Sequence, residues 1–290
     1  MRTCAWLAGL AICSTSLAAT ITVPGDFPTI SAAITAAANG DTIDVTNSAT
    51  YTESININKP LILISSGGAT ITFNTAANPV VKITSDAVVL GGGPGQGFII
   101  DQQQAGDEAI LIQGDKVKNS GVTIQNNTIK GNSGPYGIYV NPNIEGGILT
   151  IVSNNFQKRA AGYAFTDAIY FEYVAYGAPL NEDIAAHTAT ISINGNTGTD
   201  IDGEAVYFYG NVHNSDVTFN SNSFTGTAAS FTGLYVDDSL HNFSTLTCNS
   251  NTLNNFDYGY YVSSYIENQS SMTISGGAVN EFRTYGLYID

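Results

Sequence analysis

A motif of a small residue, an apolar residue, tyrosine and a second apolar residue recurs six times in this chain. The copies occupy residues 137–140, 168–171, 205–208, 233–236, 259–262 and 286–289. The last four tyrosines, at positions 207, 235, 261 and 288, follow one another at intervals of 28, 26 and 27 residues. A period in the twenties, built of strands and turns, predicts a parallel β-helix in which each repeat is one coil and each repeated position forms a column.

A second set of short strands alternates with the tyrosine motifs. Its members are residues 61–64, 87–90, 122–124, 149–151, 191–193, 217–219, 246–248 and 272–274. In the later copies a Thr or Ser stands between two apolar residues, so alternation along a strand directs the hydroxyl outward and its neighbours inward. Cys248 lies in an inward column, and we expect a buried, inert thiol.

Asparagine recurs three residues after this inward column. The copies are Asn127, Asn154, Asn196, Asn222 and Asn251, with Gly277 in the sixth repeat. Asparagine tolerates the left-handed backbone conformation, and its amide can bond to the coil above and below. We therefore expect a structural asparagine ladder at a turn.

The N-terminal region has two features before the repeats begin. Residues 5–12 are apolar and are followed by Ser16 and Ala18, which indicates a signal peptide of residues 1–18 and a secreted β-helix domain of residues 19–290. No later stretch is long and apolar enough to predict a membrane span. Residues 28–38 carry one apolar stripe with helical spacing, followed by Asn39 and Gly40, and predict a capping helix at about residues 28–39.

These segments also carry a family resemblance. Pro28 to Ile34, then Asn39 to Ile43, then Tyr51-Thr52-Glu53, together with the Asn-rich coils, resemble the pectate-lyase-like superfamily. The resemblance implies an all-β, right-handed parallel β-helix, and a carbohydrate-facing protein that is either a binding protein or a polysaccharide lyase or glycoside hydrolase. The catalytic segments of the superfamily's esterases, polygalacturonases and epimerases have no counterpart here.

The tyrosine column is the predicted binding face. Alternation directs its side chains outward, where aromatic rings can dock sugars or another protein, or can stack on one another and stiffen the sheet. The predicted substrate-binding residues are Tyr139, Tyr170, Tyr207, Tyr209, Tyr235, Asp167, His213 and His241. Insertions at residues 158–165 and 174–188 break the period beside this face, as binding loops on solenoids often do.

Acidic residues accompany the tyrosines. Asp167 and Glu204 share one phase on consecutive coils, and Glu172 and Asp237 share another on coils about 9 to 10 Å apart. Such acids can be plain surface groups, ligands of a hard cation or catalytic carboxylates. The predicted catalytic residues are Glu172, Glu204 and Asp237. The predicted metal ligands, for Ca²⁺, are Asp167, Glu204 and Asp202.

His213 and His241 both lie six residues after their tyrosine, and so are stacked neighbours in turns. They are either turn residues or, with nearby aspartates, ligands of a transition metal. The net charge of −15 argues against nucleic acid and anionic membranes as partners.

The favoured function is carbohydrate binding outside the cell. The alternatives are a polysaccharide lyase or hydrolase, and a structural surface protein or adhesin. The sequence ends directly after the sixth tyrosine motif, without a capping segment. Either a partner covers the last coil, for which self-association is one route, or the sequence is a fragment.

Overall fold

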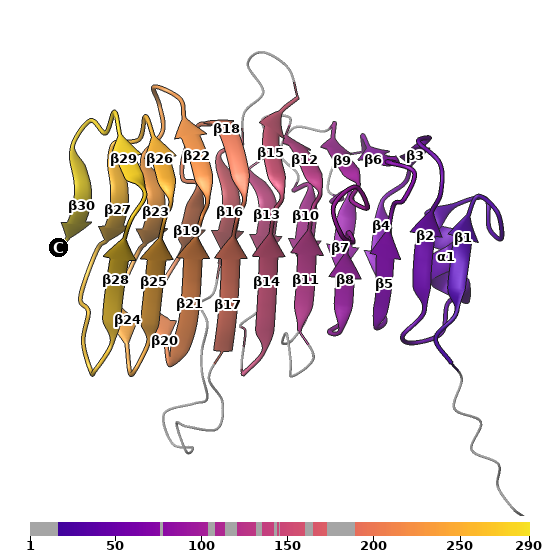
Figure 1. Cartoon of the computed structure of the whole chain (residues 1–290), viewed down its shortest axis with the longest axis horizontal. Helices are drawn as coiled ribbons and strands as arrows, with labels where there is room; N and C mark the ends of the chain where they lie inside the picture. Colours follow the sequence, from indigo (N-terminus) through magenta and orange to yellow (C-terminus); the bar gives the residue numbers. More distant parts are fainter. Residues whose placement is uncertain are drawn as a thin grey trace, which may run out of the picture.

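The strands of this chain stack into three parallel sheets that wrap around one apolar interior (Figure 1). The computed structural model describes residues 17–75, 78–103, 108–113, 121–131, 135–141, 144, 146–159, 165–172 and 189–290. Within these residues, nine successive coils each contribute one strand to each sheet. The predicted right-handed parallel β-helix is confirmed.

Sheet A, at the front in Figure 1, holds the Thr-centred strands. In spatial order its members are β1 (Thr20–Val23), β2 (Thr42–Val45), β5 (Leu61–Ile64), β8 (Val88–Leu90), β11 (Val122–Gln125), β14 (Ile148–Val152), β17 (Ala189–Asn194), β21 (Ser215–Asn220), β25 (Thr245–Asn249) and β28 (Ser271–Ser275).

Sheet B follows sheet A in every coil and lies along the upper edge in Figure 1. It consists of β3 (Thr50–Thr52), β6 (Thr70–Phe73), β9 (Ile99–Gln102), β12 (Thr128–Gly131), β15 (Asn155–Lys158), β18 (Thr197–Ile201), β22 (Ser223–Gly226), β26 (Thr252–Asn254) and β29 (Ala278–Asn280).

Sheet C lies behind and carries the tyrosine motifs. It consists of β4 (Ile55–Ile57), β7 (Val81–Ile83), β10 (Ile110–Ile112), β13 (Tyr136–Val140), β16 (Asp167–Phe171), β19 (Val206–Phe208), β23 (Thr232–Val236), β27 (Tyr258–Val262) and β30 (Tyr285–Ile289). Two short strands, β20 (Val212–His213) and β24 (Leu240–His241), pair between sheets C and A.

The inward columns form the core, as the alternation predicts. In sheet A, Ile124, Ile151, Ile193, Phe219 and Cys248 are all buried. Burial raises the pKa of the Cys248 thiol to about 12, so it stays protonated and unreactive. The interior is therefore apolar through the central coils, and its burial drives the stacking.

The asparagine ladder lies at the corner between sheets A and B. All five predicted asparagines are buried. Backbone N–H groups of Asn154, Asn196 and Asn222 each donate 2.9 Å hydrogen bonds to the side-chain oxygen of the next ladder asparagine. The side-chain amide of Asn196 donates to the Ile151 carbonyl at 2.9 Å. The ladder thus satisfies backbone groups that the corner would otherwise bury unpaired.

One detail of the predicted ladder is wrong. The left-handed residue is the one before each ladder asparagine, namely Asn126, Ser153, Gly195, Ser221 and Ser250, with positive φ angles of 56° to 64°. The ladder asparagines themselves turn inward, where their amides reach two coils at once.

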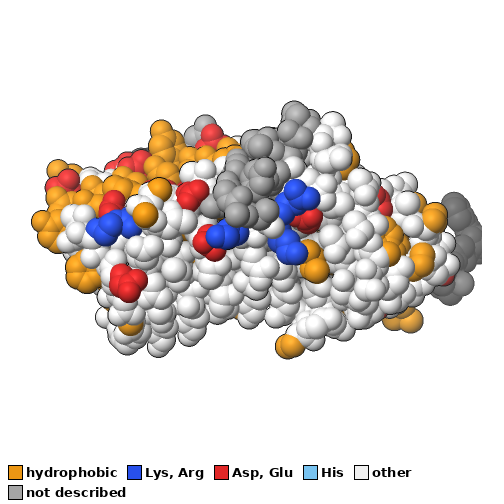
Figure 2. All heavy atoms as spheres, turned by 90° about the horizontal axis from the view of Figure 1, so that it is seen from above, with side chains coloured by type: hydrophobic (Ala, Val, Ile, Leu, Met, Phe, Trp, Pro, Cys, Tyr) orange, Lys and Arg blue, Asp and Glu red, His pale blue; other side chains and the backbone are white. Residues whose placement is uncertain are grey.

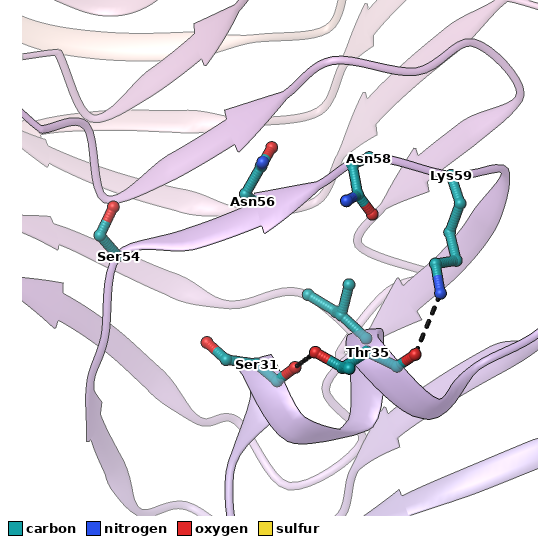
Figure 3. Close-up of a pocket in the computed structure, with 7 residues that line it drawn as sticks. Ser31, Thr35, Ser54, Asn56, Asn58 and Lys59 are labelled. Atoms are coloured by element: carbon teal, nitrogen blue, oxygen red, sulfur yellow. Dashed lines mark hydrogen bonds between the residues drawn. The ribbon is translucent and has the colours of Figure 1, made fainter.

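A single helix, α1 (Ile30–Ala36), covers the N-terminal end of the core. It is shorter than the predicted 28–39. Thr29 caps its start, and the Glu53 carboxylate accepts hydrogen bonds from Ile30 N and Ser31 N. Lys59 donates to the Thr35 and Ala37 carbonyls at the other end (Figure 3). Glu53 and Lys59 flank β4, so this strand holds both ends of the helix with charges that complement its dipole.

A pocket of about 380 Å³ separates α1 from β4 (Figure 3). Its lining comes from the helix residues Ser31, Ile34 and Thr35 and from residues around β4, including Asn56 and Lys59. It lies at the capped end of sheet C, whereas the tyrosine motifs begin with β13.

The last coil differs from the others because its inward positions are exposed. Ile274, Leu287 and Ile289 each leave more than a third of their surface accessible. Self-association through this coil stays a prediction, to be measured by light scattering on the eluting protein.

We predict that Asn196→Ala lowers the free energy of unfolding by about 2 to 4 kcal/mol, because Asn154 N and the Ile151 carbonyl lose buried partners. Urea denaturation measures the change. Asn155→Ala is the control, since Asn155 is half-buried and accepts one hydrogen bond from Thr197. Equal effects of the two substitutions would contradict a special role for the ladder.

Candidate functional site

The six tyrosines of the repeated motif form one column on the outer face of sheet C. Tyr139, Tyr170, Tyr207, Tyr235, Tyr261 and Tyr288 are direct register partners on consecutive coils. Each is half-buried rather than fully exposed. The tyrosine side chains point outward, as the alternation predicts. They are half-buried because neighbouring rings cover them.

Ring stacking covers the faces of these tyrosines. The ring centroids of Tyr207 and Tyr235 lie 4.9 Å apart with an interplanar angle of 11°, and Tyr235 and Tyr261 lie 4.8 Å apart at 12°. Parallel rings at the coil spacing occupy one another's faces. What remains accessible along this part of the column is therefore the ring edges and the phenol oxygens.

The parallel stack is interrupted at both of its ends, between Tyr170 and Tyr207 and between Tyr261 and Tyr288, whose rings lie at 65°. The Tyr170 and Tyr207 rings meet edge to face, with centroids 5.1 Å apart and an interplanar angle of 83°. Tyr209 lies beside this interruption and is 51% exposed, so part of its ring is available to a ligand.

A second column, two residues after the tyrosines, lines this interruption with carboxylates. The register places Glu172, Tyr209 and Asp237 at one position on three consecutive coils. Asn141 donates to the Glu172 carboxylate from the preceding coil. Asp237 accepts hydrogen bonds from the Tyr207 hydroxyl at 2.9 Å and from the Tyr235 hydroxyl. The exposed ring of Tyr209 thus has a carboxylate on either side.

Burial raises the pKa of both Tyr207 and Tyr235 above the usual range, and their hydrogen bonds to Asp237 add to the shift. Both phenols are therefore neutral donors, so this carboxylate is held by uncharged partners.

A buried carboxyl pair lies at the start of the same strands. Asp167 on β16 and Glu204 just before β19 are register neighbours, and the Asp167 side chain is 2% exposed. Asp167 Oδ1 accepts a 2.9 Å hydrogen bond from Glu204 N. Burial, then the hydrogen bond to Glu204 and its charge, raise the pKa of Asp167 to about 9. Asp167 therefore holds a proton at neutral pH and shares it with Glu204.

Burial also raises the pKa of Glu204, and the hydrogen bond from Asp167 opposes that shift. The negative charge of Asp237 raises it further. Glu204 is half-buried and so reaches solvent where Asp167 does not.

Thr232 lies opposite Glu204 on the next coil. Its backbone oxygen accepts a hydrogen bond from Ala205 N. Its side-chain oxygen is buried and has no hydrogen-bond partner among the described residues. Sequence reasoning missed Thr232, because a threonine at a strand end carries no distinguishing signal.

The two predicted binding histidines stack on each other at the corner between sheets C and A. His213 and His241 pair in register on β20 and β24, with ring centroids 5.5 Å apart. His241 Nε2 lies 3.0 Å from Glu267 and 3.1 Å from the Asn268 amide. His213 Nε2 lies 2.7 Å from the Asn242 amide. These contacts give both rings a structural place in the corner.

The predicted metal ligands do not gather into one group. Among the described residues, no three His, Cys, Asp or Glu side chains lie close enough together to hold a metal ion. Asp202 is exposed and accepts from the Thr227 hydroxyl at 2.7 Å. A Ca²⁺ site stays a prediction, for which calcium titration is the test. The predicted insert loops fall largely on residues outside those the structure describes.

Basic side chains lie beside acidic ones over sheet B. Figure 2, seen from above, shows basic side chains gathered over sheet B, while hydrophobic and acidic side chains follow the edge beyond it over the C-terminal half. Ion pairs join Lys158 to Asp200 at 2.6 Å and Arg159 to Asp101 at 3.2 Å. Lys158 and Arg159 are thus already paired.

Comparison with known proteins finds matches among solved structures. No family model and no curated protein matches the chain. A solved structure similar to it is an alginate lyase from Paenibacillus sp. str. FPU-7, with 14% sequence identity and a TM-score of 0.46, over 90% of this chain and 99% of that one. A likeness this distant transfers no residues and no activity. The described part of the chain contains no helix of the length and apolarity that crossing a bilayer requires.

We predict that Asp167→Asn raises the stability of the protein at about pH 8 by on the order of 1 to 3 kcal/mol. Between the usual carboxyl pKa of 3.8 and about 9, the folded state keeps a proton that the unfolded state releases. Stability is therefore lost as pH rises through this window. An amide can keep both hydrogen bonds of the protonated acid without titrating.

Urea unfolding across this pH range measures the effect, with Asp216→Asn on the exposed surface of sheet A as control. The two variants should diverge as pH rises. Parallel pH profiles for Asp167→Asn and the unsubstituted protein would show that Asp167 does not hold the proton.

Proposed function

We propose that this protein is a secreted β-helix protein that binds an extracellular or cell-wall polysaccharide through the outer face of sheet C. The apolar run at residues 5–12 and the small residues Ser16 and Ala18 support export. Binding is centred on the interruption of the tyrosine stack, where Tyr209 lies between Glu172 and Asp237.

The exposed ring of Tyr209 carries the proposal. Sugars present an apolar C–H face, which packs on an aromatic ring, and a rim of hydroxyl donors, which carboxylates accept. Tyr209 is exposed beside half-buried Glu172 and Asp237, so one short surface offers both kinds of contact. Because coils repeat every 4.8 Å or so, a linear polymer lying along the solenoid axis can contact Glu172, Tyr209 and Asp237 in turn.

We predict that Tyr209→Ala weakens binding to the polysaccharide that the intact protein retains by roughly tenfold or more, since the ring contributes both apolar contact and a specific stacking geometry. Affinity electrophoresis in gels containing plant, algal or microbial polysaccharides identifies the ligand and measures the change. Tyr209→Phe should bind like the intact protein.

Tyr265→Ala is the matched control, because Tyr265 is 66% exposed and lies in the turn after β27. If the two variants Tyr209→Ala and Tyr265→Ala retain the polysaccharide equally well, the binding site is not at the interruption of the tyrosine stack.

Polysaccharide hydrolysis or elimination is a second candidate, favoured by the Asp167–Glu204 pair. A proton held at neutral pH beside a half-buried carboxylate is a source for general acid catalysis, and Asp237 is near enough for its charge to raise the pKa of Glu204. In this version Glu204 and Asp237 contact the substrate, and Asp167 positions the proton.

If the protein is an enzyme, a screen of polysaccharides should yield new reducing ends for a hydrolase or unsaturated products for a lyase. Glu204→Gln should then lower the rate by roughly a hundredfold or more. Asp202→Asn, two residues away and exposed, should not. Retention of a polysaccharide that is never cleaved would leave binding as the function.

A further inference from the structure

Within the part of the chain that the structure describes, the acids Glu172, Glu204 and Asp237 on the sheet C face form no ion pair with a basic residue. The sequence contains no lysine or arginine between Arg159 and Arg283, an interval that includes the motifs at residues 168–171, 205–208, 233–236 and 259–262. Among the described strands of sheet C, the one basic residue is Lys82 on β7, near the capped end. Arg283 lies in the turn before β30, where it pairs with Asp257 and donates to the Thr227 carbonyl.

In the described contacts, these acids accept hydrogen bonds from neutral donors instead. Glu172 accepts from Asn141, and Asp237 accepts from the hydroxyls of Tyr207, Tyr235 and Ser263. Hydrogen bonds from neutral groups do not cancel the charge, so the face keeps a negative potential. Burial is the main reason that the pKa of Asp167 is raised, and the hydrogen bond to Glu204 and its negative charge add to the shift.

The stacked rings limit how a ligand can approach. From Tyr207 to Tyr261 the ring faces cover one another, so a ligand there meets phenol oxygens and carboxylate oxygens. All of these oxygens can accept hydrogen bonds. Thr232 adds a buried hydroxyl with no partner among the described residues, in the same column as Asp167 and Glu204. Among the described residues from β13 to β27, this surface is therefore rich in acceptors and has no lysine or arginine.

We infer that the glycan bound by this face carries free amino groups, as an oligomer or polymer of unsubstituted amino sugars does. This inference rests on the proposed carbohydrate binding and names its substrate class. Protonated amines complement the carboxylates and donate to the acceptor oxygens, while the sugar C–H face packs on Tyr209. A polyuronate would instead bring carboxylates against Glu172, Glu204 and Asp237, which costs binding energy through like-charge repulsion.

A periodic glycan also fits the face better than a basic peptide. The register partners Glu172, Tyr209 and Asp237 recur at the coil spacing, which is close to the length of one pyranose unit in an extended chain. The two sugars on either side of the sugar over Tyr209 can therefore present their amines to Glu172 and Asp237.

A matched pair of probes tests the inference on the intact protein. One is a hexamer of glucosamine and the other is the same hexamer with every amine acetylated, so the two differ in charge and not in backbone. Calorimetric titration at mildly acidic pH, with chelator present, should give roughly tenfold tighter binding for the free amine, as expected for a few surface ion pairs. The difference should shrink as salt is added.

Variants separate charge from ring contact. Glu172→Gln and Glu204→Gln should each reduce the preference for the free amine, whereas Tyr209→Ala should weaken both hexamers to a similar extent. Each substitution alters one half-buried or exposed side chain, and circular dichroism confirms that the β-helix is retained.

Three outcomes would overturn the inference. Equal or tighter binding of the acetylated hexamer would do so while leaving carbohydrate binding in place. So would binding of an oligogalacturonate, with chelator or with added calcium, more tightly than the amine. If polylysine binds as tightly as the glucosamine hexamer and no oligosaccharide competes with it, both the inference and the proposed function fail.

Discussion

Stacking in register is the constraint on which this structure depends. Every coil must place its corner, its inward side chains and its backbone groups directly over those of the coil before. The asparagine ladder shows how this is achieved, because Asn154, Asn196 and Asn222 each bond to the coil on either side. A buried amide with both donors and acceptor satisfied fixes the position of a corner more narrowly than apolar packing does. Sheets A and B can then leave that corner at the same angle in successive coils.

The same repetition decides what the tyrosines can do. A ring at one register position lies about 4.8 Å from the ring on the next coil, which is a stacking distance. The rings of Tyr207, Tyr235 and Tyr261 therefore cover one another's faces, and their column stiffens sheet C. The proposed binding site therefore lies where the stack is interrupted, between Tyr170 and Tyr207, beside the exposed ring of Tyr209.

Sequence patterns predicted sheets A and C because each strand there buries two or three apolar residues at fixed phase. Sheet B was missed, since strands such as β12, β15 and β22 bury one large side chain each, namely Ile129, Phe156 and Phe224. The burial of Asp167 was equally invisible, because alternation gives the direction of a side chain and not what covers it. The phase of Asp167 and Glu204 did predict that the two would be neighbours.

The two acidic columns show how the spacing between coils determines whether carboxyl groups are forced together. Carboxyl groups at one phase on adjacent coils are forced together, and where solvent is excluded one of them must keep its proton, as Asp167 does. Carboxyl groups two coils apart escape this penalty when a neutral residue stands between them. Tyr209 has that place between Glu172 and Asp237. The ring that separates the charges is thereby also the ring that a ligand drawn to those charges will meet.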